Sequence, residues 1–260
     1  DVYWLYSFGI DTFYVNFFSK INPQIQETKT IQMTPNIHSK EFFNYWIYVA
    51  ESNNPKCSYE LGLMYEKGEL FQRDIEKAIK YFTISSDQNF KEAQFQLGSL
   101  YLKGEYVAQN ISKAIYFYTL AAAQNVVKAQ YNLGLIYLNE NIDAEKGIYY
   151  LKLASDQDFY EAKYLLAGFY LDGKYVTQDI EKGMKYYTYL AEKNFPYAYY
   201  SLGLIYIDGI VVDQNINKGL NYLLLSADLN VCEAQYFLGD LYYKGTIVQR
   251  DINKAIKFFS

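Results

Sequence analysis

The sequence predicts an all-α solenoid, a stack of antiparallel helix pairs, and two observations lead to that prediction. First, the phrase Ala-x-x-x-Leu-Gly-x-x-Tyr recurs through the chain, with steps of 36, 36, 33, 36 and 36 residues between its Leu-Gly sites. Second, each phrase is followed by a short turn, an Asp or Asn, and a lysine three residues further on. Such a period is typical of repeats that pack only against their neighbours. The leucines of the six copies are Leu61, Leu97, Leu133, Leu166, Leu202 and Leu238.

The repeated phrase itself predicts the first helix of each pair, called helix A. In residues 91–103 the apolar side chains recur at helical spacing and form one stripe, at Ala93, Leu97, Leu100 and Tyr101. We expect Leu97 and Tyr101 to be buried, and Gln96 and Lys103 to be exposed. Five helices A are followed by a glycine, which adopts the left-handed conformation at little cost. These glycines are Gly68, Gly104, Gly173, Gly209 and Gly245.

The second helix of each pair, helix B, begins after an Asp or Asn that can cap its first turn. The predicted caps are Asp74, Asn110, Asp143, Asp179, Asn215 and Asp251. Most helices B end before an Asn or Asp that tolerates the left-handed conformation: Asn89, Asn125, Asp158, Asn194 and Asn230. A lysine follows each cap, and we expect it to pair with a nearby carboxylate: Lys77, Lys113, Lys146, Lys182, Lys218 and Lys254. The third repeat loses three residues within its A–B turn.

These residues resemble the Sel1-like repeat family, which is similar to tetratricopeptide repeats, over about residues 55–260. The resemblance implies a right-handed superhelix of paired helices, with helix A on the concave side, that scaffolds protein complexes. The departures are mild: Ala167 replaces the glycine once, Asn replaces the usual glycine between repeats, and a glycine replaces Ala after three of the lysines. Some bacterial members carry a disulfide in each repeat, which this chain lacks.

Three segments precede the repeats. Residues 41–54 are predicted to form a degenerate capping helix, and the polar residues 19–40 a linker. Residues 1–18 are aromatic and resemble the Asp-Val-Tyr-Ser-Phe-Gly stretch of tyrosine-kinase-like kinases, interrupted by residues 4–6. The alternative is an aromatic helix that packs against the first repeat. Because the chain starts on Asp1 and ends within a helix B at Ser260, we expect a fragment of a longer protein.

Composition argues against several classes of function. The only histidine is His38, so no His-based triad or metal cluster can form, and we expect no enzyme and no cofactor. The chain carries 29 acidic and 24 basic residues without a basic stripe, which argues against nucleic acid. No apolar run is long enough to span a membrane. Cys57 and Cys232 fit a reducing, cytoplasmic compartment. The glycosylation triplet Asn110-Ile111-Ser112 is explained by helix capping.

Four positions on helix A vary between repeats while the rest stays constant, and their spacing of i, i+4, i+7 and i+11 places them on one face. We interpret this face as a groove for a peptide or protein, not a small-molecule site. The apolar centre of the groove is at Leu135, Leu165, Tyr197 and Leu204, as expected for a binding hot spot. Alternatively, the leucines pack against adjacent helices A. The candidate residues are Gln96, Ser99, Lys103, Asn132, Leu135, Leu165, Asp172, Tyr197, Ser201, Leu204, Asp208, Phe237 and Asp240.

The sequence therefore predicts a non-enzymatic scaffold or adaptor that binds its partner in this groove. One alternative is a targeting or regulatory region of a larger signalling protein, such as a protein kinase. A weaker alternative, taken from the resemblance, is an adaptor in endoplasmic-reticulum-associated degradation. The missing disulfides weigh against that last alternative.

Overall fold

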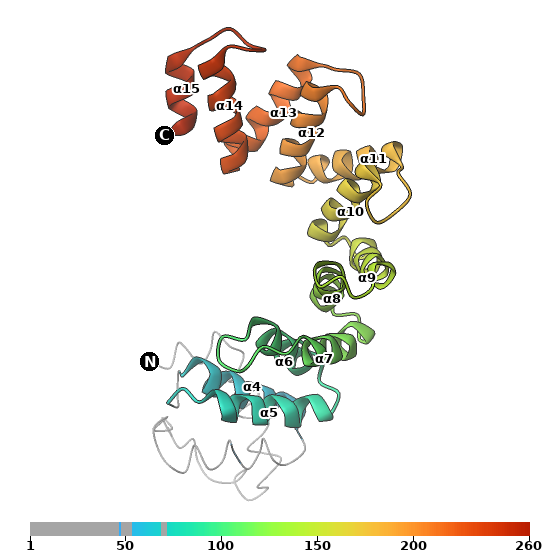
Figure 1. The fold of residues 1–260 in the computed structure, drawn as a ribbon. Helices are drawn as coiled ribbons and strands as arrows, with labels where there is room; N and C mark the ends of the chain where they lie inside the picture. The colour runs from blue at the N-terminus through green and yellow to red at the C-terminus, as the bar shows by residue number, and fades with distance from the viewer. Residues whose placement is uncertain (1–46, 48–53, 69–71) are drawn as a thin grey trace, which may run out of the picture. The chain divides into compact units, whose positions relative to one another are not determined.

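The computed structural model describes residues 47, 54–68 and 72–260, and all twelve helices with described bounds belong to the predicted repeats (Figure 1). No described residue lies in a strand. The predicted linker and aromatic segment lie outside the described residues, as does the predicted capping helix except for its residues 47 and 54. The kinase-like alternative for residues 1–18 therefore stays a prediction.

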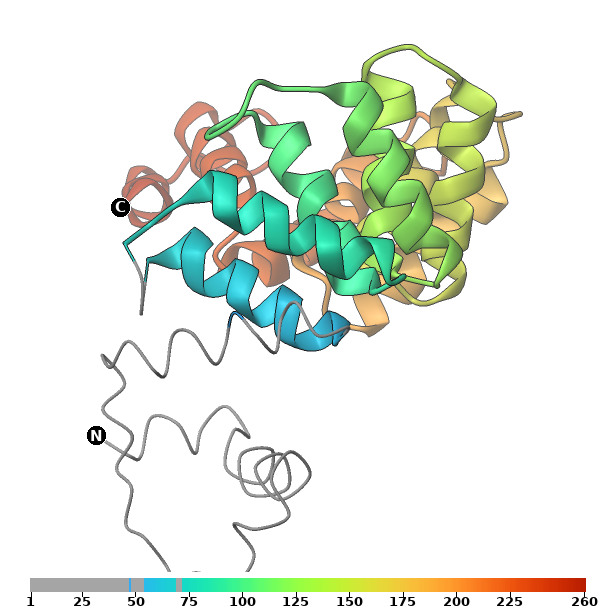
Figure 2. The ribbon, with the colours of Figure 1, turned by 90° about the horizontal axis from the view of Figure 1, so that it is seen from below.

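The chain divides into two compact units, residues 1–88 and 89–260. The first contains repeat 1, whose helices are α4 (Pro55–Lys67) and α5 (Ile75–Asp87). These two helices pack side by side (Figure 2). The Ser85 hydroxyl donates a hydrogen bond of 2.6 Å to the carbonyl oxygen of Pro55, which joins the end of helix B to the start of helix A.

The second unit contains repeats 2 to 6, in which every helix A packs against its own helix B and every helix B packs against the next helix A. The pairs are α6 (Lys91–Lys103) with α7 (Ile111–Ala123), α8 (Val127–Asn139) with α9 (Ala144–Asp156), α10 (Tyr160–Asp172) with α11 (Ile180–Glu192), α12 (Pro196–Asp208) with α13 (Ile216–Asp228), and α14 (Cys232–Lys244) with α15 (Ile252–Phe259). The predicted all-α solenoid is confirmed.

In repeats 2 to 5 the core lies between the two helices of the repeat and is closed by the next helix A. The leucine of the repeated phrase is the centre of this core: Leu97 and Leu133 are completely buried. The glycine after that leucine lets helix B approach closely. At Gly203, for example, a Cβ atom would lie 2.6 Å from Cγ of Leu223 and 3.1 Å from the carbonyl oxygen of Gly219.

The predicted helix boundaries are confirmed. Each of the six predicted caps accepts a hydrogen bond from the backbone N–H three residues later, at 2.9–3.0 Å. The five predicted Asn and Asp stops have φ angles of 57–62°, and the five glycines have φ angles of 65–75°. In the shortened third turn, Asn141 takes the left-handed conformation instead, with φ of 51°.

We expect Asp143→Ala to lower the free energy of unfolding by about 1 kcal/mol, because the Lys146 N–H would lose its acceptor. Asp143→Asn is the matched control, since Asn110 and Asn215 cap other repeats, and it should cost at most a few tenths of a kcal/mol. Urea unfolding followed by circular dichroism measures both. Equal losses for the two variants would show that the carboxylate charge, and not the cap hydrogen bond, stabilises this turn.

Candidate functional site

The four variable positions of helix A differ in exposure, and the division is the same in every repeat. The first and last positions are exposed throughout: Lys56, Glu92, Lys128, Glu161, Tyr197 and Glu233 at the first, and Lys67, Lys103, Asn139, Asp172, Asp208 and Lys244 at the last. The two middle positions are half-buried throughout: Glu60, Gln96, Asn132, Leu165, Ser201 and Phe237, then Leu63, Ser99, Leu135, Gly168, Leu204 and Asp240. We call the face formed by all four positions the helix A surface.

This division corrects two expectations for α6. Leu97 is buried and Lys103 is exposed, as predicted. Gln96, however, is half-buried, because its position on helix A is partly covered in every repeat. Tyr101 is also half-buried, not buried: its ring stacks on Phe117 at 5.9 Å, and the exposed Lys113 lies over it.

In repeats 2 and 4 the buried helix B residue is a tyrosine, Tyr118 or Tyr187, and polar residues at the half-buried positions of helix A contact its hydroxyl. The Tyr118 hydroxyl lies 3.0 Å from Oγ of Ser99. Burial raises the pKa of Tyr118, and hydrogen bonds to Ser99 and Asn132 partly offset that rise. Burial likewise raises the pKa of Tyr187, and a hydrogen bond to Ser201 opposes the rise. Polar residues at these middle positions therefore satisfy a buried tyrosine hydroxyl.

In repeats 3 and 5 the buried helix B residue equivalent to these tyrosines is a leucine, Leu151 or Leu223, and the half-buried helix A positions that surround it are apolar. Leu165 packs against the buried cluster that contains Leu151. Leu204 and Phe237 pack against the cluster that contains Leu223. The packing alternative for Leu165 and Leu204 is thus supported. Around these tyrosines and leucines, variation at the two middle positions follows internal packing, whereas the first and last positions are exposed in every repeat.

An aromatic cluster joins repeats 4 and 5 at the helix A surface. The Tyr164 ring lies 5.4 Å from Tyr187, 5.7 Å from Phe195 and 6.3 Å from Tyr197, measured between centroids. Phe195 and Tyr197 are 6.1 Å apart. The Tyr164 hydroxyl lies 3.0 Å from Oγ of Ser201, which links α10 to α12. Tyr197 remains 46% exposed, so the cluster presents an aromatic side chain to solvent.

The exposed charges on this part of the helix A surface are acidic. On α10 and α12 they are Glu161, Asp172 and Asp208, and none of these three forms an ion pair within the part of the chain that the structure describes. The backbone N–H of Lys174 donates to Asp172 at 2.8 Å, but its ammonium lies over the Tyr175 ring. These carboxylates therefore keep their charge available for a partner.

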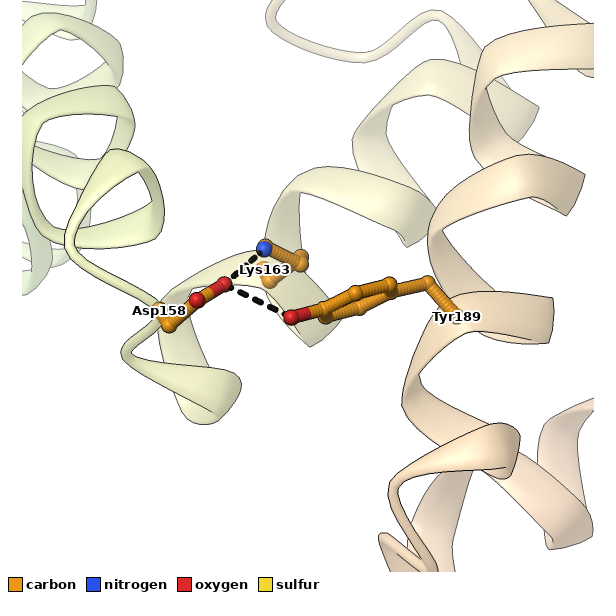
Figure 3. A network of polar contacts seen from close by, with 3 residues as sticks. All are labelled: Asp158, Lys163 and Tyr189. Carbon is orange, nitrogen blue, oxygen red and sulfur yellow. Dashed lines mark hydrogen bonds and ion pairs between the residues drawn. The ribbon is translucent and has the colours of Figure 1, made fainter.

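The lysine on α10 is engaged elsewhere (Figure 3). Nζ of Lys163 lies 2.6 Å from Oδ1 of Asp158, and the Tyr189 hydroxyl donates to the same oxygen at 2.9 Å. The lysine ammonium also lies 4.2 Å from the centroid of the Tyr189 ring. The hydrogen bond from Lys163, followed by that from Tyr189, lowers the pKa of Asp158. This contact set ties α10 to α11 and does not neutralise the helix A surface.

The recurring lysine after each cap has a second partner that sequence reasoning missed. The expected pairing with a carboxylate is confirmed for Lys77, Lys146 and Lys254. It is wrong for Lys113, Lys182 and Lys218, which form no ion pair within the described residues. In all six repeats, however, the ammonium also lies 4.0–5.8 Å from the ring of the recurring tyrosine on helix A. The signal was present in the sequence, since one tyrosine and one lysine recur in every repeat. Cation–π attraction favours this pairing, and in repeat 5 the Lys218 ammonium also donates a 2.7 Å hydrogen bond to the Tyr206 hydroxyl.

Other functional features are few in the described part of the chain. It holds no group of three or more His, Cys, Asp or Glu residues that could bind a metal ion, and no helix long and apolar enough to cross a membrane. Both cysteines are free. Cys57 is buried, and burial raises the pKa of its thiol to about 11, whereas Cys232 is exposed.

Comparison with known proteins agrees with the architecture. No curated protein matches the chain. Among solved structures, a protective antigen of uropathogenic Escherichia coli strains, which displays an SLR fold, is 27% identical with a TM-score of 0.74. The match covers 83% of this chain and 47% of that one, so this chain spans about half the length of that antigen.

Two further solved structures show the same fold at lower identity. A Sel1 repeat protein from Oxalobacter formigenes is 24% identical, with a TM-score of 0.70 over 79% of this chain and 84% of that one. An immunity protein from Pseudomonas aeruginosa is 20% identical, with a TM-score of 0.53 over 80% of this chain and 79% of that one.

A family model matches the whole repeat region without an interruption longer than one residue. Six segments match the model of the Sel1 repeat: residues 55–90, 91–126, 127–159, 161–195, 196–231 and 232–260. They coincide with the six helix pairs of the structure, from α4 and α5 to α14 and α15. The chain therefore belongs to the Sel1 repeat family.

Proposed function

We propose that the chain is a non-enzymatic scaffold or adaptor that binds a protein or peptide partner on the helix A surface of repeats 4 and 5. Sel1 repeat proteins generally serve as protein-interaction scaffolds. The observation that carries the placement is Tyr197, an exposed aromatic residue held in a cluster of rings beside unpaired carboxylates. Aromatic residues are enriched among the few residues that dominate the affinity of an interface.

The chemistry of this surface favours a protein over other partners. Nucleic acids bind through lysine and arginine contacts to phosphates, and the exposed charges of α10 and α12 on this face are carboxylates. The two free cysteines support a reducing, cytoplasmic setting. The proposed site therefore differs from the predicted groove in one respect: its energy comes from the exposed first and last positions of helix A, with the middle positions as its floor.

We expect Tyr197→Ala to weaken partner binding by about 1–2 kcal/mol, in the range of an aromatic anchor that stays partly exposed. Tyr116→Ala is the matched control, because Tyr116 is an equally large residue on helix B and is 59% exposed. Lys185→Ala, also on helix B, provides a second control. Isothermal titration with a purified partner measures the three affinities.

The comparison holds only if all variants keep the helicity and melting temperature of the unaltered protein, because a locally loosened repeat would lose binding for another reason. Unchanged affinity in Tyr197→Ala, with a loss in Tyr116→Ala, would place the site on helix B instead.

A further inference from the structure

We propose that the partner is a basic peptide segment, which places lysine or arginine side chains against Glu161, Asp172 and Asp208 and across the Tyr197 ring. This inference rests on the proposed function and adds the chemistry of the partner. The expected partner is a segment of another protein with at least two cationic side chains, because the carboxylates and the exposed tyrosine ring on α10 and α12 both attract cations.

The charge on the helix A surface differs between repeats. On α6 and α8 the first and last positions carry two lysines, Lys103 and Lys128, against one carboxylate, Glu92. On α10 and α12 the same positions carry three carboxylates, no cation and one tyrosine. An anionic segment would be repelled from repeats 4 and 5, because like charges brought together at an interface oppose binding.

The next repeat continues the acidic surface only in part. Glu233 of α14 adds a negative charge, and it lies close enough to Tyr200 on α12 to contribute to the raised pKa of that tyrosine, after the larger effect of burial. Asp240, however, is neutralised by Lys244, whose ammonium lies 2.8 Å from Oδ2. The unpaired acidic surface is therefore centred on α10 and α12 and extends only to the start of α14.

The aromatic cluster gives the second argument. A cation over a tyrosine ring is attracted by the negative face of the π system, and an arginine or lysine stem adds apolar contact. This chain already uses the arrangement in all six repeats, where a lysine ammonium lies 4.0–5.8 Å from a tyrosine ring. Tyr197 is exposed, and its ring packs against Phe195 and Tyr164. No lysine or arginine of the described residues lies over this ring, so it can take a cation from a partner.

Polar groups lie between the first and last positions of α10 and α12. The Tyr164 and Ser201 hydroxyls lie 3.0 Å apart and can accept hydrogen bonds from a guanidinium. Gly168 has no side chain, and a Cβ there would lie 3.3 Å from the Tyr187 hydroxyl. Asp172 is near enough to contribute to the raised pKa of Tyr187, after burial and the neighbouring Tyr164. The hydroxyls of Tyr164, Ser201 and Tyr187 and the carboxylate of Asp172 therefore all lie near the part of α10 between Tyr164 and Asp172.

A phage-displayed dodecapeptide library, selected on the full chain, tests the inference without a known partner. Selected peptides are resynthesised with fluorescein, and their affinities are measured by fluorescence anisotropy. The test variant is the triple change Glu161→Gln, Asp172→Asn and Asp208→Asn. The matched control removes three carboxylates from exposed positions of helix B, by Glu181→Gln, Glu192→Gln and Asp228→Asn.

We expect the selected peptides to be enriched in lysine and arginine and to lose about tenfold in affinity on the triple variant, because three exposed ion pairs would be removed together. The helix B control should bind within about twofold, and higher salt should weaken binding by the unaltered protein. Equal losses for the two triple variants would mean a general charge effect and overturn the inference.

The outcomes separate this inference from the proposed function. Peptides that lack basic residues but lose affinity in Tyr197→Ala would overturn the basic partner and leave the helix A surface as the site. Peptides unaffected by Tyr197→Ala and by the triple variant would contradict both proposals. A library that yields no binding peptide would also contradict both.

Discussion

Replacing Leu97 with alanine is expected to lower the free energy of unfolding by about 2–5 kcal/mol, the largest effect of any change considered for this chain. Leu97 is 0% exposed, so its truncation removes apolar contacts and leaves a cavity between the two helices of its repeat. Urea unfolding of the purified chain, followed by circular dichroism, measures the loss.

Lys103→Ala is the control for this change, because Lys103 lies on the same helix and is exposed. Its effect should stay within about 0.5 kcal/mol. Since each repeat contacts only its neighbours, the loss in Leu97→Ala should be strongest near α6 and α7, which hydrogen exchange can localise. A loss below 1 kcal/mol would mean that the assigned phase of this helix is wrong.

The second large effect concerns the glycine that follows the leucine. Gly203→Ala is expected to cost about 2–3 kcal/mol, because its new Cβ would lie 2.6 Å from Leu223 and 3.1 Å from the carbonyl oxygen of Gly219. A backbone oxygen cannot rotate away as a side chain can. The steric cost therefore exceeds the gain of about 1 kcal/mol that alanine normally brings to a helix interior.

Gly168→Ala is the matched control, since it makes the same change in the interior of the helix A of the preceding repeat. There the Tyr187 hydroxyl, at 3.3 Å, is the only described atom outside the backbone of α10 within 4 Å of the new Cβ, so the stability should change by less than about 1 kcal/mol. Thermal melting of both variants decides the matter. Equal melting temperatures would show that the helices of repeat 5 can separate at no cost.

Much of the fold could be predicted because its signals are local. A cap such as Asp143 acts on an N–H three residues away, and Asn125 ends its helix through its own φ angle. These signals recur in nearly every repeat, so one ambiguous copy does not change the predicted helix boundaries. The shortened third turn was also readable, because the three missing residues leave the helix phase unchanged on both sides.

The candidate site was less predictable because its exposure depends on contacts between distant residues. Ser99 and Asn132 vary between repeats, as a ligand-binding residue would, yet both serve the hydroxyl of Tyr118. The sequence of helix A alone does not distinguish a residue that varies because of internal packing from one that varies because of a ligand. Comparing helix A with the buried helix B residue of the same repeat, tyrosine or leucine, would have shown the dependence.

Site-specific photocrosslinking tests most directly whether partners bind on the helix A surface of repeats 4 and 5. Benzoylphenylalanine placed at position 197 or at position 116 replaces an exposed tyrosine in each case, on helix A and on helix B respectively. With a bound fluorescein-labelled peptide from the library selection, we expect a crosslink from position 197 and none from position 116. A crosslink from position 116 alone would contradict it.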